Sequence, residues 1–579
     1  MRRAFRMRLR VLAGLVALFA LFLIVRLYFV QVVHGADYAR KAEHQYESAS
    51  QEIYDRGTIY FSKKDGTLIS AASLLTGFTL SINPEHLKDA EGAYSAINAI
   101  LPIDRDAFMK SAQKQDDPYE VILKQIPEEK GKAIDALEID GVMLDRQRWR
   151  FYPAGTSAAQ TLGFVGYDEH NTITGRYGLE RKYEDVLARG SEGLFGNFFA
   201  ELFANVGSVV ADGRRAHEGD LITSIDPVVQ DKLVQVLKNI NDQYGSAETG
   251  GIIMDPATGE VIALDTYPSF DPNDFKNGNP EHFGNPLVEK RYEFGSIMKP
   301  LTVASGIDSG AITSSSVYND TGCITVNKKK ICNYDLKARG PNTQVQEILS
   351  QSLNVGASFV ATRIGHEGFR AYIQKLGFGT QTNVDLPSEI SGDIRNIMTS
   401  PRDVEYDTAS FGQGIAETPF EMIRALGSLA NQGAIVTPHI VKAVRLESGV
   451  TKELTYPAPV QVYRPETVAS VSTMLVRVVD TKLANGSLKI PEMTVAAKTG
   501  TAQVAAPGGG YYDSLYLHSF FGYFPAHSPR YIILLYTRYP QGVQYASETL
   551  THPFMDITHF LINYYSIPPD RASLKETAS

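Results

Sequence analysis

Cysteine, tryptophan and excess positive charge are scarce in this chain. Its 579 residues include 2 cysteines and 1 tryptophan, and its formal net charge is −9. Because neutralising phosphates requires clustered Lys and Arg, this charge argues against a nucleic-acid partner. No Cys-x-x-Cys or His-Glu-x-x-His pattern offers metal ligands at usable spacing. The sequence therefore predicts no metal site and no cofactor.

Long apolar runs are also rare, and the longest one lies near the N-terminus. Apolar residues extend from Val11 to Val30, with Arg26 as the one charged residue among them. About 20 such residues in a helix span a hydrocarbon core of about 30 Å, so a transmembrane helix is predicted over residues 11–33. The alternative is a cleaved signal peptide. Its apolar part would be only about 7–15 residues long, and Val32-Val33-His34-Gly35 lacks a clean small-residue cleavage site.

The charge before this run predicts the orientation of the chain. Five arginines fall among residues 1–10, which are expected to form a cytoplasmic tail. No later segment is long and apolar enough to return the chain across the membrane. We therefore expect a single-pass protein with the rest of the chain outside.

The remainder of the sequence divides into two large regions. Residues 35–225 are a mosaic of short strands and helices without a nucleophile or metal motif, and the acidic, helically patterned segment 85–144 is expected to be an inserted subdomain. A second domain with one long α/β pattern is predicted over residues 240–566, and the polar tail 567–579 is expected to fray.

The two cysteines occur close together, as Cys323 and Cys332. The polar residues 327–330 separate two short β-prone runs, which predicts a hairpin with the cysteines opposite one another. In an oxidising compartment such a pair would form a disulfide, whereas two free thiols are the alternative.

Three short motifs follow one another in the second domain: Ser296-Ile-Met-Lys299, Ser352-Leu-Asn354 and Lys498-Thr-Gly-Thr501. Each is weak alone, since a chain of this length contains about two Ser-x-x-Lys matches by chance at ordinary residue usage. Their order and their surroundings are the informative feature. Together they predict an acyl-transfer site.

The first motif supplies a nucleophile and a base. Ser296 is expected to open a helix, where the positive end of the helix dipole favours a developing alkoxide. Lys299 lies three residues later and shares the same face. An amine accepts a proton only when it is neutral, so Lys299 must be desolvated or crowded by another cation such as Lys498.

The second motif is expected at the polar end of a helix that runs from Glu347 to Asn354. There Ser352 would relay a proton between Lys299 and a leaving group. The carboxamide of Asn354 would bind a substrate amide.

The third motif follows a β-prone run and is expected to bind the substrate along a strand. Lys498, with the hydroxyls of Thr499 and Thr501, offers the groups that a carboxylate needs. Gly500 would let an extended peptide lie close to the strand. The backbone N–H groups of Ser296 and Thr501 are the candidates for an oxyanion hole.

The three motifs resemble the Ser-x-x-Lys, Ser-x-Asn and Lys-Thr-Gly set of penicillin-binding proteins and serine β-lactamases. Most of residues 20–565 resembles the class B penicillin-binding proteins, the monofunctional D,D-transpeptidases that cross-link peptidoglycan. The further segments that carry this likeness are Tyr292-Glu-Phe-Gly295, Gly412-Gln-Gly414, Thr418-Pro419, Asn431-Gln-Gly433 and three segments that resemble boxes of the family's pedestal, Asp55-Arg-Gly57, Arg150-x-Tyr-Pro153 and Gly178-Leu-Glu180.

The resemblance implies an α+β architecture: one transmembrane helix, a non-catalytic pedestal and a transpeptidase domain with a five-stranded antiparallel sheet between helical layers. It implies a donor stem peptide ending in D-Ala-D-Ala, whose penultimate carbonyl acylates Ser296 before an amine from a neighbouring strand resolves the ester as a 4-3 cross-link. β-Lactams mimic the donor and should acylate the same serine. The implied location is the cytoplasmic membrane of a bacterium, with the catalytic domain on the outer side.

The resemblance also implies partners. The glycosyltransferase module of bifunctional members is missing, so glycan polymerisation would come from a membrane polymerase of the SEDS family, together with other wall-synthesis proteins. The compact connection from Tyr152 to Gly175 is more similar to the septal-division subtype than to the elongation subtype. Two positions depart from the common pattern: Leu353 replaces a serine frequent in division-type members, and Phe294 replaces a frequent proline.

Two alternative functions belong to other classes. A penicillin hydrolase would need a glutamate-activated water, and no matching loop is apparent between Ser352 and Lys498. A non-catalytic protein that binds β-lactams or wall peptides could keep the fold without the chemistry, but it would have no need of both lysine motifs.

Overall fold

A computed structural model describes residues 55–571 except 115–116, 170–171, 190–217 and 507. The predicted cytoplasmic tail and transmembrane helix, residues 1–33, lie outside the described residues. Among the helices that the structure does describe, none has the length and apolar character needed to cross a membrane. The described chain forms two compact units, one with residues 74–150 and the other with residues 57–73, 151–189 and 218–571.

The smaller unit combines a sheet with helices. The later residues of β2 (Leu68–Ile82) pair with β3 (Glu120–Pro127), and β2 also pairs with β4 (Val142–Phe151). Its helices are α3 (Ala90–Ile100), α4 (Arg105–Ala112) and α5 (Glu128–Asp135). A core that includes Ile97, Phe108 and Ile126 joins the sheet to the helices.

This arrangement corrects part of the helical prediction for residues 85–144, since α3, α4 and α5 lie in that segment together with strands. All of β3 and the first residues of β4 fall inside that segment. In β3, Val121 and Leu123 are exposed while Ile126 is buried. Short apolar runs of this kind do not distinguish strand from helix by periodicity, and pairing with β2 decides the outcome.

The larger unit begins with a small sheet. β1 (Ile59–Ser62) pairs with the first residues of β2 and with β7 (Gly219–Thr223). β7 pairs in turn with β15 (Val441–Leu446), and β15 with β16 (Thr451–Glu453). The short elements of residues 151–189 are α6 (Ala159–Leu162), β5 (Val165–Tyr167), β6 (Ile173–Gly175), α7 (Gly178–Lys182) and α8 (Glu184–Leu187).

Two motifs that resembled pedestal boxes meet in this region. The hydroxyl of Tyr152 donates to Oε1 of the fully buried Glu180 at 3.2 Å, and the backbone N–H of Val165 donates to the same hydroxyl at 3.2 Å. A buried carboxylate needs such partners. The two motifs therefore hold irregular backbone together.

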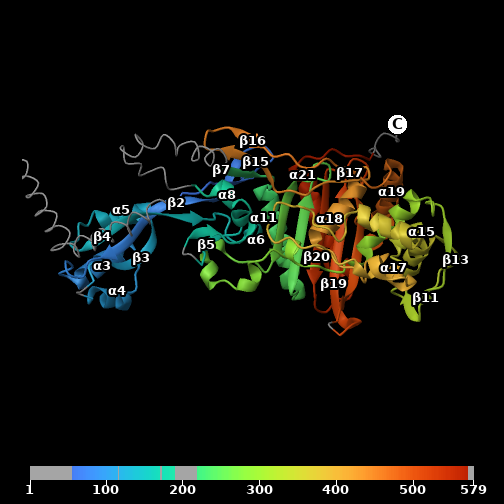
Figure 1. Cartoon of the computed structure of the whole chain (residues 1–579), viewed down its shortest axis with the longest axis horizontal. Coiled ribbons are helices and arrows are strands. Elements are labelled where there is room, and N and C mark those ends of the chain that lie inside the picture. Colours follow the sequence, from blue (N-terminus) through green and yellow to red (C-terminus); the bar gives the residue numbers. More distant parts are fainter. Residues whose placement is uncertain (1–54, 115–116, 170–171, 190–217, 507, 572–579) are drawn as a thin grey trace, which may run out of the picture. The chain divides into compact units, whose positions relative to one another are not determined.

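The central sheet has five antiparallel strands in the order β18-β19-β20-β8-β9. Two of them, β19 and β20, are labelled in Figure 1. Their bounds are β8 (Glu248–Met254), β9 (Val261–Tyr267), β18 (Ala496–Ala505), β19 (Tyr511–Phe524) and β20 (Tyr531–Arg538). This is the five-stranded antiparallel sheet that the family resemblance implied.

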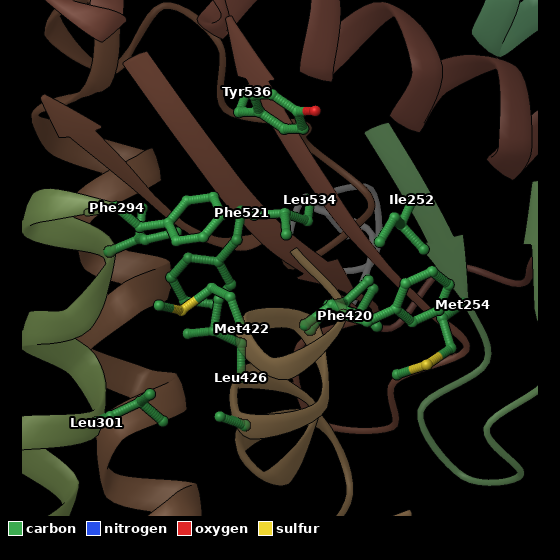
Figure 2. Packing of buried hydrophobic residues seen from close by; sticks show 14 of the residues in the cluster. Ile252, Met254, Phe294, Leu301, Phe420, Met422, Leu426, Phe521, Leu534 and Tyr536 are labelled. Carbon is green, nitrogen blue, oxygen red and sulfur yellow. The ribbon is translucent and has the colours of Figure 1, made fainter. Parts of the chain in front are cut away.

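Both faces of the sheet are apolar because its strands alternate between two cores. Ile253, Ile533 and Phe520 face one core, with α11 (Pro227–Tyr244) and α21 (Thr551–Tyr564). The opposite face points toward a second, larger core. Figure 2 shows its strand residues, among them Ile252, Leu534 and Phe521, packed against side chains of α13 (Lys299–Asp308) and α18 (Pro419–Gly427).

The larger core also receives the remaining helices, so the sheet lies between helical layers. These helices are α12 (Pro286–Glu289), α14 (Gln346–Ser350), α15 (Asn354–Lys375), α16 (Arg395–Thr399), α17 (Asp403–Ala409) and α19 (Pro465–Thr481). The short helix α20 (Ala546–Thr549) precedes α21 in the chain. Besides the pair β5–β6, the described residues form three two-stranded sheets, which pair β10 (Val317–Asp320) with β13 (Gly340–Gln344), β11 (Cys323–Val326) with β12 (Lys329–Cys332), and β14 (Ala434–Ile435) with β17 (Val460–Gln461).

Candidate active site

Two contacts anchor the segment directly before Ser296. Phe294 is fully buried and its ring lies edge-on to Tyr536 of β20, with ring centroids 6.4 Å apart (Figure 2). Burying such a side chain is worth about 1.5–3 kcal/mol. The backbone N–H of Gly295 donates to Gly412 O at 3.0 Å. The unusual Phe294 therefore serves as an anchor directly before the nucleophile.

Ser296 lies in one turn of 3₁₀ helix, η5 (Gly295–Met298), which runs directly into α13. The sequence predicted that Ser296 opens the helix, and the tighter first turn is a small difference. Gly295 has φ +63°, and a Cβ there would lie 2.7 Å from Thr501 O. Glycine at 295 therefore lets the segment turn sharply and approach β18.

The second motif lies between two helices, so the prediction of one helix through Asn354 is wrong. α14 ends at Ser350, and Asn354 is the first residue of α15. Between them Ser352 has φ +56°, a left-handed conformation that is costly for a residue with a Cβ. Leu353 is fully buried, and its burial helps to fix the turn. The turn directs both polar side chains of the motif toward Lys299.

The amine of Lys299 is the centre of the site. Its Nζ lies 2.9 Å from Ser296 Oγ, 3.2 Å from Ser352 Oγ, 2.6 Å from Ser352 O and 2.8 Å from Asn354 Oδ1. The side chain is fully buried. The structure thus brings together the residues of the first two motifs around one nitrogen.

The partners of Lys299 determine what a neutral amine does here. The backbone oxygen of Ser352 and Oδ1 of Asn354 can only accept hydrogen bonds, so they take both hydrogens of the neutral amine. The nitrogen lone pair then remains for the hydroxyl of Ser296, which donates to it. This geometry suits Lys299 for taking the proton of the nucleophile.

Burial makes the neutral form accessible. Desolvation lowers the pKa of Lys299 well below its ordinary value, and the nearby charge of Lys498 lowers it further. This agrees with the requirement derived from the sequence, namely that Lys299 be desolvated or lie near another cation.

Lys498 of β18 is the second buried amine of the site. Its Nζ donates to Ser352 Oγ at 3.0 Å and to Thr499 O at 2.9 Å. Burial lowers its pKa to about 7, so Lys498 is only partly charged at neutral pH before a ligand binds. The hydroxyl of Ser352 lies between the two amines, which is the placement that a proton relay requires.

The rest of the third motif lies along β18. Thr499 and Thr501 line the pocket, and Oγ1 of Thr501 accepts from the backbone N–H of Ala546 at 3.0 Å. The hydroxyl hydrogen of Thr501 therefore remains for a ligand. The close approach of Gly295 to Thr501 also brings together the backbones of the two predicted oxyanion-hole residues, Ser296 and Thr501.

Gly500 has a different role from the expected one. It is not among the described residues that line the pocket. A Cβ at this position would lie 2.6 Å from Phe294 O and 2.3 Å from Ser519 Oγ. The backbone that Gly500 accommodates is thus the protein's own, in the segment that carries Ser296. The hydroxyl of Ser519 reinforces this contact by donating to Phe294 O at 2.7 Å.

The pocket around these groups has a volume of about 780 Å³. Among the described residues that line it there is no carboxylate, while Lys482 and His552 add to the basic character that Lys498 gives the wall. The rings of Tyr334 and Tyr545 lie edge-on at a centroid distance of 5.9 Å. The pocket is therefore suited to an anionic ligand.

Several lining residues could not be identified from the sequence. Tyr334, Tyr545, Gln544 and Phe411 lie in connections between elements and belong to no motif. Gln413 is the exception, since it belongs to the Gly412-Gln-Gly414 segment that carried part of the family resemblance.

Cys323 and Cys332 form a disulfide and stand opposite one another in the β11–β12 hairpin. The hairpin and the pairing are those that the sequence pattern predicted. Among the described residues no cluster of His, Cys, Asp or Glu could hold a metal ion.

Comparison with known proteins places the chain in a class. The family model described as the penicillin-binding protein transpeptidase domain matches residues 249–558, and the model of the penicillin-binding protein dimerisation domain matches residues 54–195. The chain belongs to the penicillin-binding protein transpeptidase family, and the pedestal and transpeptidase pattern is that of its class B members.

Individual relatives cover most of the chain. A peptidoglycan D,D-transpeptidase FtsI homolog of Mesostigma viride is 28% identical over 590 residues, covering 95% of each chain. Penicillin-binding protein PbpB of Mycolicibacterium smegmatis is 30% identical over 450 residues, which is 73% of this chain and 66% of that protein. The crystal structure of penicillin-binding protein 3 from Mycobacterium tuberculosis in complex with aztreonam has the same fold, with a TM-score of 0.67 at 22% identity, covering 90% of this chain and 98% of that one.

The pKa of Lys498 leads to a prediction about ligand charge. Because this pKa is about 7 in the free protein, the affinity for a carboxylate-bearing penicillin should fall as the pH rises above about 7. In Lys498→Ala the affinity at neutral pH should fall about 10- to 100-fold, as expected for a lost charge-assisted hydrogen bond worth about 1.5–3 kcal/mol, and the pH dependence should disappear. The measurement is the concentration dependence of the acylation rate.

The matched control for this prediction is a carboxylate-free ester of the same ligand. Its affinity should change little between the wild type and Lys498→Ala. An equal loss with both ligands would show that Lys498 acts on the nucleophile and not on the carboxylate.

Proposed function

We propose that this chain is a peptidoglycan D,D-transpeptidase that works through an acyl-enzyme at Ser296. The observation that carries the proposal is the position of the Lys299 amine, 2.9 Å from the Ser296 hydroxyl and held by two acceptors that leave its lone pair for that hydroxyl. A serine with such a base, beside a basic pocket, is equipped for acyl transfer from a peptide that ends in a carboxylate.

The groups of the site account for each step of the proposed reaction. Ser296 Oγ attacks the penultimate D-Ala carbonyl of the donor, and its proton passes to Lys299 Nζ. The N–H groups of Ser296 and Thr501 face the oxyanion of the tetrahedral intermediate. When the amide C–N bond breaks, the departing D-Ala amine takes up a proton through Ser352, whose hydroxyl lies within 3.2 Å of both lysine amines. An amine of a second stem peptide then attacks the ester, loses its proton along the same path and releases Ser296.

The composition of the pocket favours this function over the penicillin hydrolase. A hydrolase of the common kind uses a carboxylate to activate the deacylating water, and the described lining residues include none. The non-catalytic alternative is disfavoured because a protein that only binds has no use for two buried amines, each of which is costly to desolvate.

The proposal extends to the setting of the reaction. Residues 11–33 would anchor the chain in the cytoplasmic membrane of a bacterium, with the N-terminus inside and the transpeptidase domain outside. Septal wall synthesis is favoured over elongation by the compact connection between Tyr152 and Gly175, and a SEDS-type glycan polymerase would supply the strands. Two observations support a location of the transpeptidase domain outside the membrane: the apolar run near the N-terminus and the disulfide in the catalytic domain.

A fluorescent penicillin tests the proposed function. We expect one label per chain, attached to the tryptic peptide that contains Ser296. The labelled protein should be recovered from the membrane fraction of cells. A fluorescent fusion of the protein should be concentrated at division sites. The label should persist, since the described residues that line the pocket include no carboxylate to activate a deacylating water. Absence of label on this peptide would refute the acyl-enzyme, while rapid turnover of nitrocefin would favour the hydrolase. A fusion spread along the side wall would refute the septal assignment alone.

A further inference from the structure

The disulfide-closed hairpin lies directly beside the second motif. Cys323 and Cys332 are direct partners in the register of β11 and β12, so the disulfide closes the open end of the hairpin. The two residues at that end, Cys332 and Asn333, both bond to the beginning of α15. The steps of the proposed reaction involve neither of these two hydrogen bonds.

The first bond orients the carboxamide of Asn354. Its Nδ2 donates to Cys332 O at 2.9 Å. A backbone carbonyl can only accept, so the nitrogen must face the hairpin and the oxygen must face Lys299, to which it is bonded at 2.8 Å. If the carboxamide were released from Cys332 and rotated, Lys299 would lose one of the two acceptors that keep its lone pair directed at Ser296.

The second bond caps α15 from outside the helix. The residue before α15, Leu353, has an apolar side chain and provides no cap. Instead Oδ1 of Asn333 accepts from the backbone N–H of Val355 at 3.2 Å. Asn333 is buried, and its Nδ2 donates to both carboxylate oxygens of the fully buried Asp320, at 2.9 and 3.1 Å. Asn333 thus holds the helix start to the base of the hairpin, as a helix cap does.

We propose that the hairpin closed by Cys323 and Cys332 is a positioning element for Asn354, and through it for the Lys299 amine, so that opening the disulfide slows acylation of Ser296. This inference rests on the proposed function. Cys332, Asn333 and Asp320 are positioning residues, since they act on the reacting groups only through Asn354.

The chemical step is a simple exchange. A dithiol reductant transfers two protons and two electrons to the protein: the S–S bond breaks, Cys323 and Cys332 become thiols, and the dithiol closes to its own disulfide. Both cysteines are partly exposed, so a small reductant has access to them. After reduction the four strand pairs of the hairpin and the hydrogen bonds of Asn333 remain, but the covalent link that holds Cys332 to Cys323 is lost, and Cys332 O can move away from Asn354.

The surroundings of Lys299 provide a readout that a general loss of structure would not move. The charged group that faces its amine is Lys498 from β18, while Ser352, Asn354 and Phe411 approach from the other elements and are neutral. If Asn354 shifts and water reaches the amine, the pKa of Lys299 rises toward its ordinary value. The acid limb of the acylation rate, where Lys299 becomes protonated, should then move to higher pH.

The experiment compares the full-length wild type in oxidised form with the same protein reduced by a dithiol and alkylated at both thiols, and with the double variant Cys323→Ser/Cys332→Ser. The rate constant for acylation by a fluorescent penicillin is measured across pH. We expect a loss of about tenfold on opening the disulfide, within the range of up to 10²-fold that small misplacements cost, together with the upward shift of the acid limb.

Two controls separate the possible outcomes. The reductant should leave the double variant unchanged, and Lys329→Ala, an exposed change at the hairpin tip that leaves both bonds to α15 intact, should label like the wild type. An unchanged rate constant and acid limb in the fully reduced protein would overturn the inference, and so would a lower yield of active protein with an unshifted acid limb. Failure of the oxidised wild type to label would instead overturn the proposed function.

Discussion

Replacing Lys299 with alanine is expected to reduce the acylation rate of Ser296 by about 10³- to 10⁴-fold, the upper part of the range for loss of a general base. The reason is that the Lys299 amine is bonded directly to the Ser296 hydroxyl, at 2.9 Å, and burial lowers its pKa well below its ordinary value. The measurement is the second-order rate constant for labelling by a fluorescent penicillin, with Ser296→Ala as the reference for zero reaction.

A second variant separates lost chemistry from lost structure. Lys299→Met keeps the volume of the side chain without an amine, so it avoids the cavity that alanine would leave. Both variants should unfold cooperatively and both should fail to label. Labelling at the wild-type rate in either folded variant would show that another group removes the proton of Ser296.

Gly500→Ala should produce the second largest loss, about 10²-fold in the acylation rate, the cost of moving a reacting group by about 1 Å. The added Cβ would lie 2.6 Å from the backbone oxygen of Phe294, far inside contact distance. Because Phe294 is fixed in the core, the strain must be relieved by separating β18 from the segment that carries Ser296. The affinity for the ligand carboxylate should change less than the rate of the chemical step.

Gly508→Ala is the matched control for this prediction. It lies in the connection between β18 and β19, and a Cβ there meets no atom within 4 Å. This variant should label like the wild type. If Gly500→Ala also labelled normally, the contact between Phe294 and β18 would have no part in placing the nucleophile.

The structure brings the residues of the three motifs together, and the sequence could single them out because each motif is tied to a local structure. The Ser-x-x-Lys spacing places Ser296 and Lys299 on one face of a helical turn, and the β-prone run before Lys498 leads into a strand. The five-stranded sheet was expected from the family resemblance, and the structure shows why it is stable: its strands alternate apolar residues between two cores. The order of the three motifs along the chain, which is visible in the sequence, was the reason to expect them in one site.

What could not be predicted depends on tertiary contacts. The left-handed turn at Ser352 is stabilised by the burial of Leu353 and by bonds to Lys299, and none of these has a local signal. The strands within residues 85–144 form because β2 offers a partner. Gly500 was assigned to the substrate because a glycine in a strand indicates a close backbone, but the sequence cannot tell whose backbone it is.

The two buried amines have a consequence for the energetics of the whole domain. An unfolded chain binds a proton at Lys498 up to about pH 10.4, whereas the folded chain releases it at about pH 7, so the folded state is penalised by several kcal/mol at neutral pH. This penalty is greatest at and below neutral pH and fades as the pH approaches the lysine's unfolded value. Without a ligand, the folded domain carries this unfavourable contribution at Lys498. A bound anion stabilises the protonated amine, so binding of the donor carboxylate also stabilises the fold.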